Sequence, residues 1–485
     1  MDNTPAKLVF IPNPAHGHIM STVQIAKLLV DRDQHLSITV LVIKFPSFGS
    51  HTPTTTYIDS LAKNNTTSRI SFIELPQNEF PPLDDSKSSY SFFGDFIDSH
   101  CNYVRNVVAD IVTQPGSGRL AGFVIDMFFT SMIDIANEFN VPSYVFYTTN
   151  ASFLGFMFYI QLLDQSQNVV ELSNSNTEVS VPSYAKPVPT RVFWDIVQTR
   201  EGMDYILTII RKLREVKGIM VNTFLELETH AFKSLADDIS TPPVYPVGPI
   251  LNLESVAKQP SDDDIIRWLD SQPPSSVVFL CFGSMGSFDE IQVKEIARAL
   301  EQSGHRFVWC LRQPPSDQIS KLPGNYEDPG TVLPKGFLER THGIGKVMGW
   351  APQVEVLAHI AVGGFVSHCG WNSLLESLWF GVPIATWPVY AEQQMNAFKM
   401  VVEMGLAVDI KLDYRKDVLN VKANTVTVTA EEIESGIRRV MEDTEVRTKV
   451  KDMSDKSRRV LAEGGSSYAS VGRFIQDVRG NISSF

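Results

Sequence analysis

Two histidines and an aspartate follow apolar segments of the chain at points where a strand would give way to a helix. His16 and His18 lie in a Pro/Gly turn after the apolar run Leu8–Ile11, and Asp126 directly follows the apolar run Ala121–Ile125. An imidazole with an ordinary pKa of about 6.5 can take a proton at neutral pH. A lone carboxylate where a buried strand ends usually has a functional role or caps a helix. From the residues alone, a histidine in such a turn is more often a polar surface residue, and Asp126 could be a helix N-cap.

A second group of polar residues follows the apolar run Val362–Ser367. Gly370 is placed to make a turn there, and Trp371–Phe380 has the length and composition of a helix that closes at Gly381. A strand, a glycine turn and a helix in this order direct backbone N–H groups and the positive end of the helix dipole at an anion. The segment therefore predicts a phosphate site.

Side chains at this helix start would extend the phosphate site. His368, Asn372 and Ser373 supply further hydrogen-bond donors, and Glu376 lies one turn deeper on the same helix face. A carboxylate at that depth would repel phosphate but suits the two adjacent hydroxyls of a ribose. The spacing fits a nucleotide along one helix face, while a capped helix with a surface glutamate remains an equal alternative.

The elements that must position these residues alternate between strand and helix patterns. In the first half we predict strands at 7–12, 37–43, 121–125 and 143–146, with helices at 19–30 and 132–139. In the second half we predict strands at 276–282, 307–311, 362–367 and 384–388, with helices at 291–302 and 371–380, and helical segments from 430 to 462 and 468 to 478. Such alternation predicts α/β domains with doubly wound parallel sheets, which bind ligands at the carboxyl ends of their strands.

Composition narrows the possible functions. The chain has 485 residues, of which 43% are hydrophobic and 20% charged, and this length and composition fit two globular domains. Its net charge of −13 disfavours nucleic acid and membrane partners. The four cysteines are scattered, without a CxxC pair, and no stretch of 18 apolar residues occurs. We therefore expect a reduced, cytoplasmic protein without a structural metal. For the acidic triplet Asp262–Asp264 we expect a charge at a helix N-terminus rather than a metal site.

From Trp350 to Gln393 the chain resembles the signature box of plant secondary-product UDP-glycosyltransferases, which belong to glycosyltransferase family 1. The matching positions are Trp350–Gln353, His368–Ser373, Glu376, Gly381–Pro383 and Glu392-Gln393. The resemblance extends over the whole chain, including the Gly-His near its start and the FGSMGS stretch at 282–287. It resembles in particular the enzymes that glucosylate flavonoids, other phenolics and terpenoids.

The resemblance implies the GT-B fold, with two Rossmann-like domains facing each other across a cleft. It implies an N-terminal acceptor-binding domain (1–245), a linker (242–251, rich in proline), a C-terminal UDP-sugar-binding domain (252–463), and a last helix (466–485) that packs back on the first domain. The implied activity is inverting, metal-independent O-glucosylation of small lipophilic acceptors, with UDP-glucose as co-substrate and no cofactor. We further expect a monomer without integral membrane association. Acceptor identity and regiochemistry cannot be read from the sequence.

The resemblance also assigns roles to residues. It implies that His18 is the base and Asp126 its partner, while His16 has no family counterpart and is expected to be a loop residue. For the donor it implies that Trp350 stacks on uracil, that Ala351 holds uracil by its backbone, and that Thr148 contacts the sugar. The remaining donor contacts that it implies are Gln353 and Glu376 at the ribose, Ser284, His368, Asn372 and Ser373 around the diphosphate, and Glu392 and Gln393 at the sugar hydroxyls. Trp371 is also among the implied donor-binding residues.

Two details of the box bear on donor choice. Many family members have Asp where this chain has Glu392, so the carboxylate reaches one methylene further. Gln393 resembles enzymes that use glucose, whereas His at this position is associated with galactose. Another UDP-sugar, such as UDP-galactose or UDP-xylose, therefore stays an alternative donor.

Two other classes of protein compete with this interpretation. A nicotinamide oxidoreductase would need Gly-x-Gly-x-x-Gly after the first strand, and the turn Pro14–His18 lacks it. A non-catalytic UDP-sugar binding protein could lose the base or its partner, yet His18 and Asp126 are both present. The residues Phe153–Leu163 could line an acceptor pocket or belong to the core, and their spacing does not decide between the two.

Overall fold

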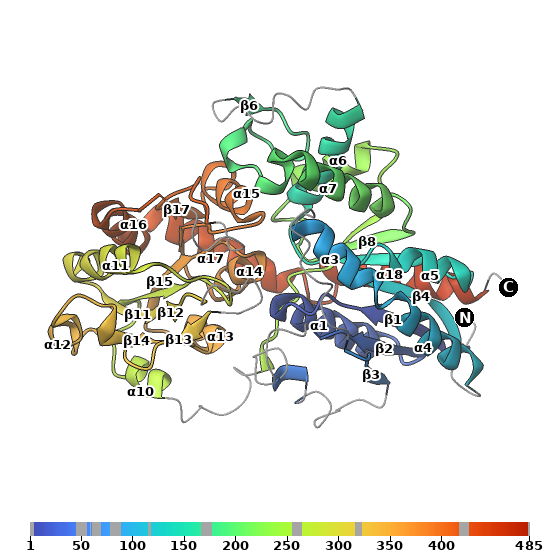
Figure 1. Cartoon of the computed structure of the whole chain (residues 1–485), viewed down its shortest axis with the longest axis horizontal. Coiled ribbons are helices and arrows are strands. Elements are labelled where there is room, and N and C mark those ends of the chain that lie inside the picture. The colour runs from blue at the N-terminus through green and yellow to red at the C-terminus, as the bar shows by residue number, and fades with distance from the viewer. Residues whose placement is uncertain are drawn as a thin grey trace. The chain divides into compact units, whose positions relative to one another are not determined.

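The computed structural model describes residues 4–44, 56–58, 60, 69–77, 89–114, 118–165, 177–254, 264–315, 323–416 and 426–483. It divides into two compact units (Figure 1). Unit 1 comprises Met1–Glu171, Ile196–Leu251 and Arg459–Phe485, and unit 2 comprises Leu172–Asp195 and Asn252–Arg458.

Unit 1 is built on a seven-stranded sheet in the order β3-β2-β1-β4-β5-β8-β9, with all neighbouring strands parallel. The strands are β1 (Ala6–Ile11), β2 (Leu36–Val42), β3 (Ile70–Glu74), β4 (Arg119–Asp126), β5 (Ser143–Tyr147), β8 (Gly218–Val221) and β9 (Val244–Pro246). Strands β1, β2, β4 and β5 are rich in β-branched and aromatic residues and are almost wholly buried, as expected for strands covered on both faces. The prediction of a doubly wound parallel sheet is confirmed.

Helices cover the sheet of unit 1. They are α1 (His16–Arg32), α3 (Ser89–Asp98), α4 (Cys101–Thr113), α5 (Met132–Glu138), α6 (Ala151–Gln165), α7 (Arg200–Leu213), α8 (Thr229–Asp237) and α18 (Ser466–Ser483), with a short 3₁₀ turn at Asp195–Gln198. The last of these, α18, is red in Figure 1 and lies beside β4 and β9. Its side chains Val471, Phe474 and Val478 are at most 1% exposed and join the core of unit 1.

Unit 2 is built on a six-stranded sheet in the order β14-β11-β10-β15-β16-β17, again parallel throughout. Its strands are β10 (Val277–Cys281), β11 (Arg306–Cys310), β14 (Gly345–Met348), β15 (Val362–Ser367), β16 (Ile384–Thr386) and β17 (Ala407–Asp409). Two short antiparallel pairs accompany this sheet, β6 (Glu178–Val179) with β7 (Val188–Pro189) and β12 (Arg312–Gln313) with β13 (Gly324–Asn325).

The helices of unit 2 are α10 (Asp264–Asp270), α11 (Glu290–Ser303), α12 (Phe337–Thr341), α13 (Gln353–Ala358), α14 (Trp371–Phe380), α15 (Gln393–Phe398), α16 (Ala430–Glu442) and α17 (Thr444–Arg459). Short turns lie at Thr190–Val192 and Pro329–Thr331 (3₁₀) and at Lys399–Glu403 (π). Strand β15 and helix α14 have the predicted bounds. Of the acidic triplet, Asp264 begins α10 as expected, while residues 262 and 263 lie outside the described part of the chain.

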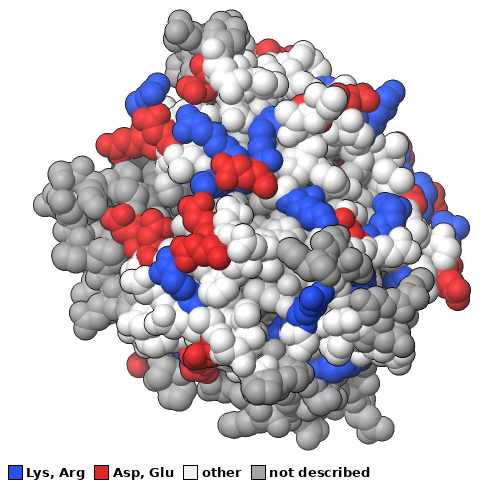
Figure 2. All heavy atoms as spheres, turned by 90° about the vertical axis from the view of Figure 1, so that its right-hand side faces the viewer, with Lys and Arg blue, Asp and Glu red and all other residues white. Residues whose placement is uncertain are grey.

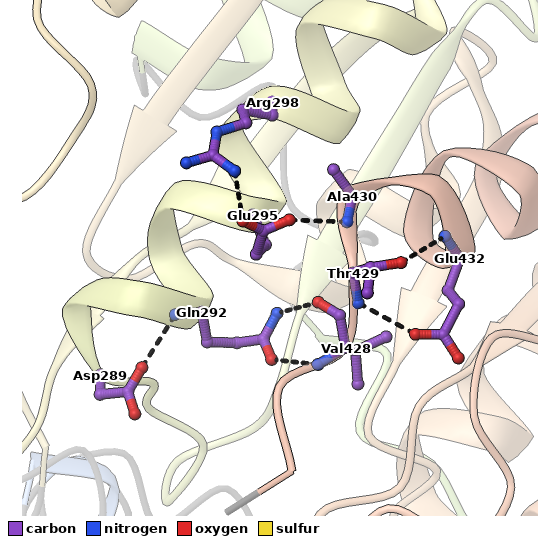
Figure 3. Close-up of polar contacts among 8 residues, drawn as sticks. All are labelled: Asp289, Gln292, Glu295, Arg298, Val428, Thr429, Ala430 and Glu432. Carbon is purple, nitrogen blue, oxygen red and sulfur yellow. Dashed lines mark hydrogen bonds and ion pairs between the residues drawn. The ribbon is translucent and has the colours of Figure 1, made fainter.

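Side chains of α11 form hydrogen bonds with backbone groups at the start of α16 (Figure 3). The Gln292 amide on α11 donates to the carbonyl oxygen of Val428 and accepts from its N–H, both at 2.8 Å. Glu295 accepts from the Ala430 N–H at 2.8 Å, and Thr429 and Glu432 form a capping box at the start of α16. The N-terminus of α16 is therefore held by α11 and by its own cap.

The segment that includes residues 177–195 packs with unit 2, although the sequence predicts it within the first domain (1–245). The backbone N–H of Lys186 donates to the Glu403 carboxylate at 3.1 Å, and the Lys399 ammonium lies 5.6 Å from the centre of the Tyr184 ring. The Arg415 guanidinium donates to the carbonyl oxygens of Arg191 and Phe193. Contacts between residues about 200 positions apart decide this placement, and no local pattern encodes them.

On the face shown in Figure 2, basic and acidic side chains are intermixed over the described residues. In unit 1, some side chains of opposite charge form surface ion pairs, such as Arg105 with Glu138 and Lys212 with Asp134. In the part of the chain that the structure describes, no helix is long and apolar enough to cross a membrane.

Candidate active site

His18, Asp126 and Thr148 come together in unit 1. His18 Nδ1 lies 2.6 Å from Asp126 Oδ2 and 3.0 Å from Thr148 Oγ1. The Asp126 side chain is 1% exposed, whereas the His18 side chain is 27% exposed. A buried carboxylate that holds one imidazole nitrogen leaves the opposite side of the ring, with Nε2, for proton transfer.

Sheet topology explains why residues so far apart in sequence meet. Strands β1 and β5 flank β4, with Ile11 paired to Ile125 and Asp126 paired to Phe146. His18 follows β1 in the first turn of α1, Asp126 ends β4, and Thr148 follows β5. All three therefore lie at the carboxyl edge of the sheet, where the strand order reverses at β1 and β4, and such an edge is the usual ligand site of these folds.

The predicted loop position of His16 is wrong. We expected a loop residue, but His16 is the first residue of α1, half-buried, with its ring centre 6.2 Å from that of Tyr57. Burial lowers the pKa of His16. The helix begins three residues earlier than the predicted start at residue 19, and Ala15, which has extended backbone angles, is its N-cap.

In unit 2 the start of α14 has the features of an anion site. The N-cap residue Gly370 makes no side-chain cap, and backbone N–H groups of a first helical turn point toward an anion placed before it. Asn372 is partly exposed in this first turn, while the Trp371 side chain is 2% exposed and lies in the core. Ser284 follows β10, the strand next to β15, where the order of this second sheet reverses.

The His368 ring is held between two glycines at the same strand end. A Cβ on Gly283 or on Gly370 would lie 2.6 Å from His368 Nε2, so both positions exclude a larger residue. Burial lowers the pKa of His368 to about 4. A hydrogen bond to the Cys281 carbonyl favours the charged form, but it offsets only part of this shift. Its Nδ1 atom is buried and has no hydrogen-bond partner within the described ranges. The ring is thus neutral at pH 7, with an unused nitrogen beside the helix start.

Gln353 links the phosphate end of α14 to Glu376. Its Nε2 donates to Ser373 Oγ at 2.9 Å and to Glu376 Oε2 at 2.6 Å. Burial raises the pKa of Glu376 to about 7, although the Gln353 hydrogen bond opposes this shift. Ser373 and Glu376, which the sequence predicts on one face of α14, are therefore brought together with Gln353 of α13. The Glu376 carboxylate is poised between its two protonation states at neutral pH.

Trp350 follows β14 and is 40% exposed, a large value for an indole. The Arg312 guanidinium lies 5.3 Å from the centre of its ring, a cation–π distance, and the next residue, Ala351, is 6% exposed. An exposed indole face beside a buried backbone is suited to stacking on a planar base.

Gln393 and Glu392 lie at the start of α15. The Gln393 Oε1 atom accepts from the backbone N–H groups of Val389 (2.9 Å) and Tyr390 (3.0 Å), which fixes the orientation of the amide. Asn396 is fully buried and donates from Nδ2 to the Cys369 carbonyl at 3.0 Å and to Glu392 Oε1 at 3.3 Å. One buried amide therefore connects Glu392 to the turn that precedes α14.

Sequence reasoning missed Arg312 and Asn396. Arg312 follows β11 at the carboxyl edge of the sheet, so its position after a predicted strand was an available signal. Asn396 carries no such signal, because only the packing of α15 against the Cys369 turn shows what its amide contacts. Within the described residues, no group of three or more His, Cys, Asp or Glu side chains could hold a metal ion.

Comparisons with known proteins agree with this arrangement. Residues 238–455 match the model of the family described as UDP-glucoronosyl and UDP-glucosyl transferase. UDP-glycosyltransferase 71A15 of Malus domestica is 52% identical over 483 residues, covering 98% of this chain and 99% of that protein. UDP-glucose flavonoid 3-O-glucosyltransferase 6 of Fragaria ananassa is 53% identical over 487 residues, with the same coverage.

Among solved structures, Medicago truncatula UGT71G1 complexed with UDP-glucose is 40% identical and superposes with a TM-score of 0.85, covering 98% of this chain and 99% of that one. This similarity confirms the GT-B fold class predicted from the sequence. With about half of all positions identical to those relatives over nearly its whole length, the chain belongs to the UDP-glycosyltransferase family and is a glycosyltransferase.

Proposed function

We propose that this protein transfers glucose from UDP-glucose to a hydroxyl group of a small lipophilic acceptor, with inversion at the anomeric carbon and without a metal. The observation that carries the proposal is the 2.6 Å contact between His18 Nδ1 and the buried Asp126 carboxylate. The Fragaria relative named for flavonoid 3-O-glucosylation supports a phenolic acceptor. Terpenoid acceptors remain within the proposal.

In the proposed reaction His18 acts as the general base. As the acceptor oxygen attacks the anomeric carbon, its proton passes to Nε2, and the bond between that carbon and the diphosphate oxygen breaks. Asp126 accepts from Nδ1–H and stabilises the imidazolium as it forms. Thr148 Oγ1 lies 3.0 Å from the same Nδ1 atom and would hold the same ring, and we assign the predicted sugar contact to this side chain.

The leaving UDP needs stabilisation of the charge that develops on its diphosphate. We assign this task to the first turn of α14, with Ser284, His368, Asn372 and Ser373 as further contacts. Trp350, Ala351, Gln353 and Glu376 would hold the uridine. These donors take the place that a metal ion has in other sugar-nucleotide enzymes.

The proposal places the reaction in the cytoplasm, whose reducing conditions fit the four free cysteines, and it takes the protein to be a monomer.

The base is tested by comparing two histidines of the same turn. We expect His18→Ala to lower the rate of UDP release with UDP-glucose and a flavonol at least about a hundredfold while UDP still binds. The matched His16→Ala should stay within about tenfold of the wild-type rate. Wild-type turnover by His18→Ala on a phenolic acceptor would remove His18 from the role of base. If the wild-type protein binds UDP-glucose but turns over no acceptor, the non-catalytic binding protein is the better description.

Donor choice is tested at Gln393. Its amide oxygen is held by two backbone N–H groups, so its N–H₂ group is the part available to a sugar hydroxyl. We expect Gln393→His to lower the ratio of UDP-glucose to UDP-galactose turnover. The neighbouring Gln394 is equally buried, but its Nε2 donates to the Tyr414 carbonyl at 2.8 Å, so Gln394→His should leave the ratio unchanged. An unchanged ratio in Gln393→His would exclude Gln393 from sugar selection.

A further inference from the structure

Two cysteine thiols lie next to each other beneath the uridine end of the candidate donor site. Cys281 ends β10 and Cys310 ends β11, one residue beyond the registered parallel pair Leu280 and Trp309. The two thiols are hydrogen-bonded to each other. Residues at equal height on neighbouring strands point to the same face of a sheet, which is the arrangement that a short cross-link requires.

The surroundings connect this pair to residues that we assign to the donor. The Ala351 backbone N–H donates to the Cys310 sulfur, and the Gly283 backbone N–H donates to the Cys281 sulfur. The His368 ring in turn bonds the Cys281 carbonyl. A chemical change at Cys310 would therefore alter the hydrogen bond that holds the Ala351 backbone, and a change at Cys281 would alter the one that holds Gly283, next to Ser284.

Reactivity differs between the two thiols. The hydrogen bond from Cys310 lowers the pKa of Cys281, while burial and the same hydrogen bond raise the pKa of Cys310. Cys281 is partly exposed, and Cys310 is 6% exposed. Since the thiolate is the form that attacks an oxidant, Cys281 would react first and Cys310 would resolve the product.

We propose that Cys281 and Cys310 form a redox-modifiable dithiol that a hydroperoxide converts to a disulfide, and that this cross-link weakens donor binding. The Cys281 thiolate attacks the peroxide, the O–O bond breaks, and a sulfenic acid and hydroxide form. The Cys310 thiol then attacks the sulfenic sulfur, forms the S–S bond and releases water. In total two thiols lose two electrons and two protons, and one hydrogen peroxide becomes two waters.

The effect on binding follows from the hydrogen bonds named above. A disulfide removes the mutual thiol hydrogen bond and shifts both sulfurs toward each other, so the Ala351 and Gly283 N–H groups lose well-placed acceptors. This part of the inference depends on the proposed UDP site, whereas formation of the cross-link does not. Because linkage is reciprocal, bound UDP should also protect the dithiol from oxidation.

The full-length reduced protein is treated with hydrogen peroxide and analysed by intact mass and by peptide mapping without reductant. We expect the loss of two hydrogens, a Cys281–Cys310 cross-link, and UDP binding weakened about tenfold or more by calorimetry, with recovery after dithiothreitol. Cys281→Ala should keep its UDP affinity after peroxide. Cys310→Ala should form no cross-link and should accumulate a sulfenic acid at residue 281 that dimedone traps.

Cys101→Ala is the matched control, because Cys101 lies on α4 in unit 1 and burial raises its pKa, so this variant should respond to peroxide like the wild type. Absence of the cross-link, or a cross-link without any change in UDP affinity, would overturn the proposal. If the reduced protein does not bind UDP, the proposed donor fails, while the mass measurement still decides whether the dithiol closes. If one cysteine variant does not fold, the other carries the test.

Discussion

Glu376 shows how the needs of a ligand site can oppose those of the fold. Its carboxylate lies on α14, where burial raises its pKa to about 7, and it accepts a hydrogen bond from Gln353. An ionised carboxylate is the form that accepts from two ribose hydroxyls. Without ligand, this side chain therefore destabilises the protein at and above neutral pH, and such a cost is common where a residue serves binding.

The sign of this effect gives a pH-dependent prediction. The ordinary pKa of 4.5 holds in the unfolded chain and about 7 in the folded one, so the destabilisation is absent below about pH 4.5 and complete above about pH 7. At its full value it amounts to up to about 3 kcal/mol. We expect Glu376→Gln to raise the melting temperature relative to wild type by an amount that grows from pH 5 to pH 8, while UDP binding weakens.

The control for this measurement is Glu463→Gln, which makes the same charge change at an exposed residue. Its difference from wild type should stay flat over the same pH range. A Glu376→Gln difference that does not change with pH would contradict the raised pKa.

At the scale of elements, strand order at the carboxyl edges of the two sheets places the site residues, and helix contacts hold those edges in position. Helix α11 follows the loop that carries Ser284, and its Gln292 satisfies both backbone groups of the buried Val428 (Figure 3). Buried backbone groups that lose their partners cost more than an exposed ion pair does.

We therefore expect Gln292→Leu to lower the free energy of unfolding of unit 2 by about 2–4 kcal/mol, since both Val428 groups would lose their partners. Arg298 provides the comparison, because it lies two turns along α11, is 55% exposed, and pairs only with Glu295 among the residues drawn in Figure 3. Arg298→Ala should cost less than about 1 kcal/mol in chemical denaturation. Equal losses in both variants would show that the Gln292 amide is replaceable, for instance by water.

At the scale of the molecule, the chain closes its first unit with its last helix. Phe474 on α18 is 0% exposed and meets the Tyr144 and Tyr245 rings edge-on, with ring centres 5.0 and 5.6 Å away. Tyr144 also donates to Asp477 Oδ2 at 2.6 Å. The core of unit 1, and with it the sheet that carries His18 and Asp126, thus includes residues from both ends of the sequence.

Phe474→Ala should consequently destabilise unit 1 by about 3–5 kcal/mol, the range for removing a buried phenyl ring. Gln476→Ala, on the exposed side of the same helix, should change stability by less than about 0.5 kcal/mol. Thermal unfolding followed by calorimetry checks both. A Phe474→Ala protein as stable as wild type would mean that α18 is not part of the cooperative core.

The sequence by itself determined the central strands of both sheets, several helices and the resemblance of the donor box. Apolar periodicity and glycine or proline punctuation are local, and they placed β15 and α14 correctly to the residue. The box from Trp350 to Gln393 is one continuous segment, so its resemblance to a family could be seen without a structure.

Only the tertiary structure decided which distant residues meet. It placed Thr148 on the same imidazole nitrogen as Asp126, Asn396 between Glu392 and Cys369, and Cys281 beside Cys310. It also placed the segment that includes residues 177–195 with the second unit. The physical reason is that hydrophobic spacing records which face of an element is buried, whereas strand order and register depend on packing between segments up to hundreds of residues apart.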